Sequence, residues 1–167
     1  MLVGEYGVVL GGSALCVPFR KYTARIRSMS DIPSGKNKEA SQSLEYISQL
    51  YTYIRKQGAG AFHATPDLDL FQKSLREYWL DLNIPIGYGL GSSGTVSAAI
   101  YDLFFSQSGS LSLNHQKEDL AVIESYFHGK SSGVDALTCF ADSPLRFRKS
   151  GSIEKVAFDP ENLKGGY

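Results

Sequence analysis

The chain has 167 residues, of which 43% are hydrophobic and 12% aromatic, enough for a single domain with a buried core. It carries 17 basic and 17 acidic residues, so no overall charge draws it to nucleic acid or to an acidic membrane. No stretch reaches the length of a membrane span, and no secretory signal is recognisable at the N-terminus. Cys16 and Cys139 lack metal-site spacing. We therefore expect a cytoplasmic protein with reduced, buried thiols and no nucleic-acid or membrane partner.

The first half of the chain contains three strand patterns followed by helix patterns. The strands are expected at residues 8–10, 14–17 and 22–27. After a polar loop over 31–38, apolar residues recur at helical spacing from Leu44 to Ile54, in a helix that Gly58 ends. Thr65-Pro66-Asp67 predicts a second helix, with Thr65 as the cap and Pro66 at the first helical position.

The second half mixes both element types without regular alternation. We expect a strand near 78–84, helices over 92–105 and 114–127, and a hairpin of 145–147 with 153–158 about Ser150-Gly151. This order favours an α+β fold over a doubly wound sheet. We expect one domain over residues 1–160, with 161–167 as the start of a linker to a further domain.

A glycine-rich turn is the most informative feature of the chain. Residues 85–95 read Pro-Ile-Gly-Tyr-Gly-Leu-Gly-Ser-Ser-Gly-Thr and lead into an apolar helix start. Glycines leave backbone N–H groups unshielded, and the new helix directs its positive end at the same point. The turn therefore predicts a phosphate-binding loop.

Other interpretations of this turn fit less well. The segment Gly89 to Val96 satisfies both the dinucleotide fingerprint and the protein-kinase glycine loop, but the flanking sequence lacks the other parts of either site. The Gly-Lys-Ser/Thr of a Walker A loop is absent. A serine that only caps the helix is the structural alternative, yet four glycines and two serines within residues 87–94 exceed what one cap needs.

A second group of polar residues runs from Glu124 to Asp135. Taken alone, Glu124 and His128 form an ordinary helix-face pair, and Ser132 with Asp135 forms a capping box. Beside a phosphate loop, the two carboxylates can have a catalytic role. Phosphoryl transfer needs Mg2+ and a group that orients or deprotonates the attacking hydroxyl. We expect Ser93 and Glu124 to hold Mg2+ and Asp135 to act on the hydroxyl.

Three segments together resemble the N-terminal signatures of the GHMP kinases. They are Gly4 to Gly12, Pro85 to Gly94 and Glu124 to Asp135, in matching order and separation. The resemblance implies an α+β domain of the ribosomal protein S5 domain 2-like fold, with a left-handed βαβ unit. It also implies that ATP phosphates lie in the loop, that Mg2+ binds Ser93 and Glu124, and that Asp135 is catalytic. The loop residues are Gly89, Leu90, Gly91, Ser92, Ser93 and Gly94.

Within this family the chain is most similar to bacterial mevalonate kinases, since the block Glu-x-x-x-His-Gly-x-x-Ser-Gly-x-Asp is matched throughout. The resemblance therefore implies transfer of the γ-phosphoryl of MgATP to a small alcohol, and mevalonate is the alcohol that it favours most. Tyr6 stands where many mevalonate kinases have histidine, so phosphomevalonate kinase or a sugar kinase is the alternative.

The resemblance also predicts parts that this sequence lacks. The family has a catalytic lysine just before the position of Gly4 and a glycine-rich C-terminal domain. We therefore expect an N-terminal half that is inactive alone and that dimerises through the surface left bare. A non-catalytic nucleotide-binding or interaction module is the alternative of another class. His63 and His115 are expected to be ordinary surface residues, and Arg20, Lys21 and Lys130 are unranked candidates for acceptor recognition.

Overall fold

The computed structural model describes residues 12–84 and 92–157. The strand expected at 8–10, most of the motif from Gly4 to Gly12, and the phosphate-loop residues Gly89, Leu90 and Gly91 lie outside these ranges. The expected linker at 161–167 also lies outside them.

Helices and short strands alternate irregularly along the described residues. The helices are α2 (Asn37–Gln57), α3 (Leu68–Ser74), α4 (Ser92–Phe104), α5 (Leu113–His128) and α6 (Val134–Ala141). The strands are β1 (Ala14–Cys16), β2 (Ala24–Ser28), β3 (Thr65–Pro66), β4 (Tyr78–Leu82), β5 (Phe105–Ser106), β6 (Leu145–Phe147) and β7 (Ile153–Lys155). Short 3-10 turns cover Met29–Asp31, Ala59–Ala61 and Ser108–Ser110.

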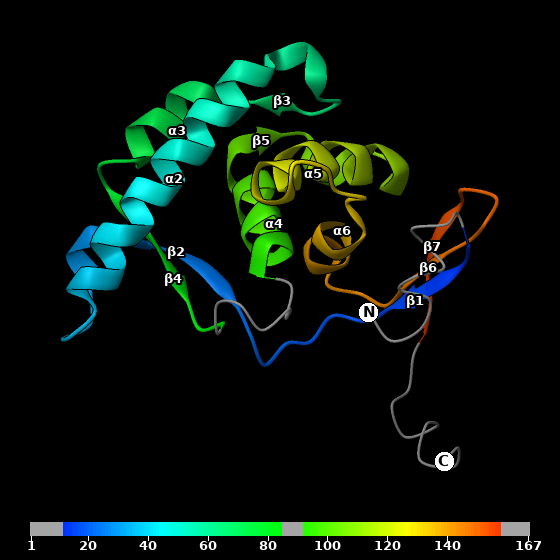
Figure 1. Ribbon diagram of the computed structural model, residues 1–167, viewed down its shortest axis with the longest axis horizontal. Coiled ribbons are helices and arrows are strands. Elements are labelled where there is room, and N and C mark those ends of the chain that lie inside the picture. The colour runs from blue at the N-terminus through cyan, green and yellow to red at the C-terminus, as the bar shows by residue number, and fades with distance from the viewer. Residues whose placement is uncertain (1–11, 85–91, 158–167) are drawn as a thin grey trace.

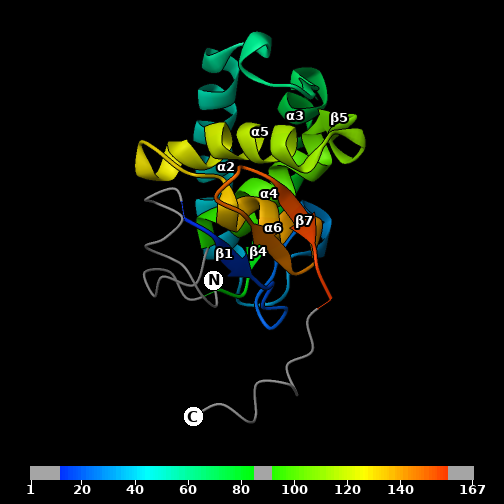
Figure 2. The same ribbon diagram turned by 90° about the vertical axis from the view of Figure 1, so that its right-hand side faces the viewer.

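The strands form three small antiparallel sheets, in the orders β1-β6-β7, β2-β4 and β3-β5. Helices α4 and α6 lie between the β2-β4 ribbon and the β1-β6-β7 sheet (Figure 1). Seen from the side, the β1-β6-β7 sheet lies in front of α6 (Figure 2). Helices and antiparallel strands mixed without regular βα alternation make this an α+β arrangement. No parallel pair occurs among the described strands, so the S5-like topology with its βαβ unit stays a prediction.

Helix α4 is the centre of the core. It is buried on most of its circumference, and it packs against α5 and α6 as well as against β2. This burial explains why most residues from Val96 to Phe104 are apolar, while Asp102 and Leu103 are exposed. Across the described ranges, none of the helices is both long and apolar enough to cross a membrane.

Several predicted elements are confirmed. Helix α2 ends where Gly58 adopts a positive φ of 77°, although it begins at Asn37, inside the expected loop. Strand β4 occupies the first part of the predicted strand, and β6 and β7 pair as the predicted hairpin, with Phe147 opposite Ile153.

The predicted helix start at Thr65-Pro66 is wrong. Both residues belong to β3, where Thr65 pairs with Ser106 and Pro66 with Phe105. The helix begins at Leu68 instead, and the Asp67 side chain caps it by accepting a hydrogen bond from Leu70 N at 2.9 Å. A strand partner forty residues away overrides the local helix signal.

A buried carboxylate joins three segments of this core. Asp119 on α5 is fully buried and accepts hydrogen bonds from His63 N at 2.7 Å, Ala64 N at 2.9 Å and the Tyr101 hydroxyl at 2.7 Å. It thereby ties the segment before β3 to α4 and α5. Burial raises the pKa of Tyr101, and the bond to Asp119 raises it further, so this phenol remains a donor.

We expect Asp119→Ala to lower the free energy of unfolding by about 3 to 5 kcal/mol, because three buried donors lose their acceptor. Tyr101→Phe is the matched variant, since it removes one bond and leaves two donors on Asp119; its expected cost is about 1 kcal/mol. Urea unfolding measures both values. Equal costs for the two variants would show that the backbone bonds to Asp119 contribute nothing.

Candidate functional site

The site forms where two helices begin side by side. Gly94, in the first turn of α4, faces the first turn of α6 so closely that an added Cβ would lie 3.0 Å from Ala136 N and 3.1 Å from Asp135 C. Only glycine permits this backbone approach without displacement. Both helix N-termini therefore lie close together, with Ser93 and Asp135 beside the contact.

A chain of hydrogen bonds links α4 to the end of α5. Ser93 Oγ donates to Glu124 Oε1 at 3.2 Å, and His128 Nε2 lies 3.0 Å from Ser93 Oγ. Because the serine hydroxyl has one hydrogen and gives it to the carboxylate, the bond from His128 requires its Nε2–H as donor. Glu124 and His128 thus meet on Ser93, from one face of α5.

The turn after α5 supplies a further hydrogen-bond donor to Glu124. Ser131 Oγ donates a short hydrogen bond to Glu124 Oε2 and accepts one from Gly133 N at 3.0 Å. Gly133 begins α6 at a φ of 71°, and an added Cβ would lie 2.2 Å from Lys117 O. The capping box expected from Ser132 and Asp135 does not form, because the N-cap position is taken by this glycine.

Glu124 is a buried acid and not the surface charge of an ordinary helix pair. Only 5% of the residue is exposed. Burial raises its pKa above the ordinary value, and the negative charge of Asp135 acts in the same direction, while hydrogen bonds from Ser131 and Ser93 oppose the shift. The net effect is a carboxylate that is poorly compensated in the absence of a cation.

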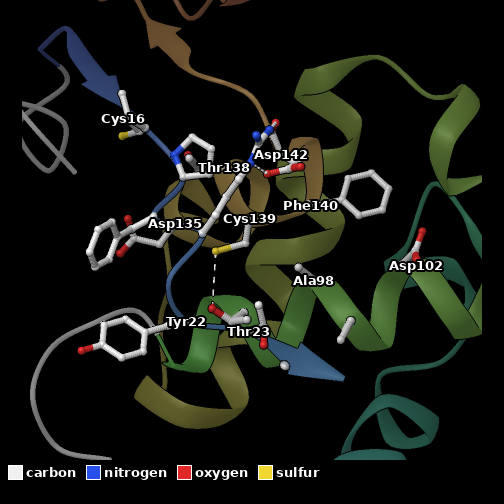
Figure 3. A pocket seen from close by; sticks show the side chains of 17 residues that line it. Cys16, Tyr22, Thr23, Ala98, Asp102, Asp135, Thr138, Cys139, Phe140 and Asp142 are labelled. Carbon is white, nitrogen blue, oxygen red and sulfur yellow. Dashed lines mark hydrogen bonds and ion pairs between the residues drawn. The ribbon is translucent and has the colours of Figure 1, made fainter. Parts of the chain in front are cut away.

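A pocket of about 740 Å³ adjoins Asp135. Its walls come from α4, α6 and the segment between β1 and β2 (Figure 3). The Cys139 thiol faces Thr95 across it, with Sγ and Oγ1 3.6 Å apart. At its rim the Arg20 guanidinium holds Asp142 through Nε to Oδ1 at 2.9 Å and Nη2 to the backbone oxygen at 3.1 Å. Of the three basic candidates for acceptor recognition, Arg20 alone lines this pocket.

Sequence reasoning singled out Ser93, Gly94, Glu124 and Asp135, and the structure brings these four together from three helices. Ser92 is the first residue of α4. The chemical roles assigned to all of them stay predictions.

Two polar residues of the site had no assigned role, namely His128 and Ser131. The sequence suggested His128 only as a helix-face partner of Glu124, whereas it bonds to Ser93. The position of His128 one turn after Glu124 was the available signal. His63 and His115, expected at the surface, stack on each other with ring centroids 4.1 Å apart, and His63 also pairs with Glu118.

The donor set suits a hard cation. Across the described residues, no group of three or more histidine, cysteine or acidic side chains is arranged to bind a metal. Mg2+ in nucleotide sites needs less, because one carboxylate is commonly supplemented by phosphates and water. The oxygens of Glu124 and Ser93, 3.2 Å apart, fit that pattern. The positive N-termini of α4 and α6 favour anionic groups beside it.

The contact at Gly94 predicts a sharp response to a single methyl group. Gly94→Ala is expected to lower the free energy of unfolding by about 1 to 3 kcal/mol, because the new Cβ meets backbone atoms of α6 that cannot rotate away. Gly109→Ala is the control, since nothing lies within 4 Å of its added Cβ. Chemical denaturation compares the two, and equal stability of both variants would contradict the close helix approach.

The buried acid predicts a pH dependence. Because the folded-state pKa of Glu124 is raised, the folded chain binds a proton more tightly than the unfolded chain, and stability falls as the pH rises from the unfolded to the folded pKa. We expect Glu124→Gln to be more stable than the parent at neutral pH, with the difference shrinking towards pH 4. Thermal unfolding across this range measures it. A difference independent of pH would rule out ionisation of Glu124 as its cause.

Comparison with known protein families gives a match. The model of the N-terminal domain of GHMP kinases matches residues 45–142, which is more than half of the chain. No curated protein and no solved structure matches this chain. The matched range contains α4, α5 and α6 and therefore Ser93, Glu124 and Asp135. On this match the chain belongs to the GHMP kinase family.

Proposed function

We propose that this chain binds MgATP at the start of α4 and takes part in transfer of the γ-phosphoryl group to the hydroxyl of a small molecule. The observation that carries the proposal is the meeting of Ser93 with the buried Glu124 beside Gly94 and Asp135. Family membership supports a phosphotransferase. ATP and Mg2+ are the cofactors that this family membership suggests.

Each residue has a role that its surroundings support. Ser93 and Glu124 would hold Mg2+, which neutralises charge on the phosphates when it is bound. The backbone N–H groups at the start of α4, together with residues 89–91, would hold the phosphates. His128 and Ser131 fix the hydroxyl of Ser93 and the carboxylate of Glu124 in place. Asp135, which is solvent-exposed, would orient the acceptor hydroxyl or accept its proton.

The motif resemblance makes mevalonate the first acceptor to test. This resemblance rests on the block from Glu124 to Asp135. The block contributes to the proposed phosphate and metal end of the site and to only part of the acceptor pocket. A sugar is the second candidate, and one observation favours it: carboxylates line the pocket beside Asp135. Carboxylates accept hydrogen bonds from sugar hydroxyls.

A test separates catalysis from nucleotide binding. In the full-length protein, we expect Asp135→Asn to leave the Kd for MgATP within about twofold, while phosphoryl transfer to an acceptor falls about 100-fold or more. Asp69→Asn on the exposed face of α3 is the matched control and should change neither value. Calorimetry gives the Kd, and transfer of labelled phosphate gives the rate.

Glu124→Gln extends the same experiment to the metal. It should weaken binding of ATP in the presence of Mg2+ and leave binding of metal-free ATP unchanged, because only the metal ligand is altered. In the full-length protein, binding of MgATP without any phosphoryl transfer would favour a non-catalytic nucleotide-binding module. Failure to bind MgATP at millimolar concentration would overturn the proposal.

A further inference from the structure

The pocket beside Asp135 is elongated along two helices that start together. Gly94 contacts Asp135 at the near end, the Tyr101 and Phe140 rings pack 5.1 Å apart further along, and Thr95 contacts Cys139 in between. Asp102 on α4 therefore lies at the opposite end from Asp135, as Figure 3 also shows. Gly94 and Asp102 are eight residues apart on α4, which places the two ends roughly 12 Å apart.

Acidic groups dominate the charge of this pocket. Its described lining contains Asp102, Asp135 and Asp142, with Arg20 as the one basic residue. Arg20 is already paired with Asp142, Nε to Oδ1 at 2.9 Å, so these two charges largely cancel. Asp102 and Asp135 have no ion-pair partner among the described residues. Two carboxylates, one at each end, therefore have no basic side chain of the described residues paired with them.

The middle of the pocket adds no opposing charge. Ala98 and the Cys139 thiol lie between its two ends, and Cys16 lies on the same side as Asp135 (Figure 3). Burial raises the pKa of Cys16 to about 11 and that of Cys139 above its ordinary value, so both thiols are neutral at pH 7. A bound molecule thus meets a weakly polar centre, with a carboxylate at each end that accepts hydrogen bonds and donates none.

We propose that this pocket binds a neutral or positively charged polyhydroxy compound, and that it disfavours an acceptor carrying a carboxylate or a phosphate. Hydroxyl or ammonium groups would donate to Asp102 at the far end while the reacting hydroxyl lies at Asp135. An anionic acceptor would face two like charges, and bound MgATP is itself anionic. This inference rests on the proposed function, since it assigns the pocket to the acceptor of that reaction, and it favours the sugar over mevalonate, the acceptor that the motif resemblance puts first.

Three hexoses that differ in charge test the inference. Glucosamine, glucose and glucuronate share one ring and are cationic, neutral and anionic at pH 7. We expect the nucleotide-free chain to bind glucosamine most tightly and glucuronate most weakly, and to bind mevalonate no better than glucuronate. Ligand-observed NMR titration at low salt gives the Kd values, and the preference should shrink as salt screens the carboxylates.

Variants connect the preference to the pocket. Asp102→Asn should reduce the ratio of glucosamine to glucuronate affinity by about two- to fivefold, the range expected for one solvent-exposed charge pair. Asp69→Asn on α3, also exposed but away from this pocket, should leave the ratio unchanged. An equal response of both variants would assign the preference to the overall charge of the chain and overturn the inference.

The remaining outcomes separate this inference from the proposed function. Tighter binding of mevalonate or glucuronate than of glucose would overturn the charge preference and leave phosphoryl transfer standing. No binding of any of the four probes, with MgATP still bound, would overturn the assignment of the pocket to the acceptor. A chain that binds the sugars but not MgATP would support the pocket and count against the kinase reaction.

Discussion

The backbone contact between α4 and α6 at Gly94 is the constraint on which the site depends. Because no side chain separates the two helices there, their first turns lie against each other, with 3.0 Å between an added Cβ and Ala136 N. That contact places Ser93 beside α5 and Asp135 beside the pocket. Gly133 imposes a second constraint, since only a residue without a side chain can begin α6 so close to Lys117 O. Two glycines thus determine where the polar groups meet.

The surroundings of Glu124 are unfavourable for a charged side chain. Its carboxylate is buried next to another negative charge, and the described structure offers it hydroxyl donors and His128 instead of a lysine or arginine. Hydroxyl groups hold a carboxylate in position without neutralising it. A side chain arranged in this way is unfavourable in the empty protein and favourable once a cation is present, which is the behaviour expected of a metal ligand.

The sequence predicts elements whose signals are local. Gly58 ends α2, alternation marks β4, and Ser150-Gly151 turns the β6-β7 hairpin, because periodicity and turn residues act within a few positions. The helix start at Thr65-Pro66 failed because its strand partner lies at Phe105-Ser106. Motif spacing selected Ser93, Glu124 and Asp135, whereas the contact of His128 with Ser93 depends on how α4 packs on α5. Tertiary packing is the part that spacing alone cannot supply.

The proposed phosphate end and the proposed acceptor end of the site share helices α4 and α6, but they differ in how tightly their residues are held. Ser93, Glu124 and Asp135 sit at helix ends fixed by close packing, and they fall within the range that matches the GHMP family. Arg20 lies before that range, in the segment between β1 and β2, and Asp102 sits on an exposed turn of α4. Residues at such exposed positions can change without disturbing the helix contact at Gly94. Membership of the family therefore constrains the proposed reaction more strongly than the proposed acceptor, and the charge of the pocket lining is the better guide to that acceptor.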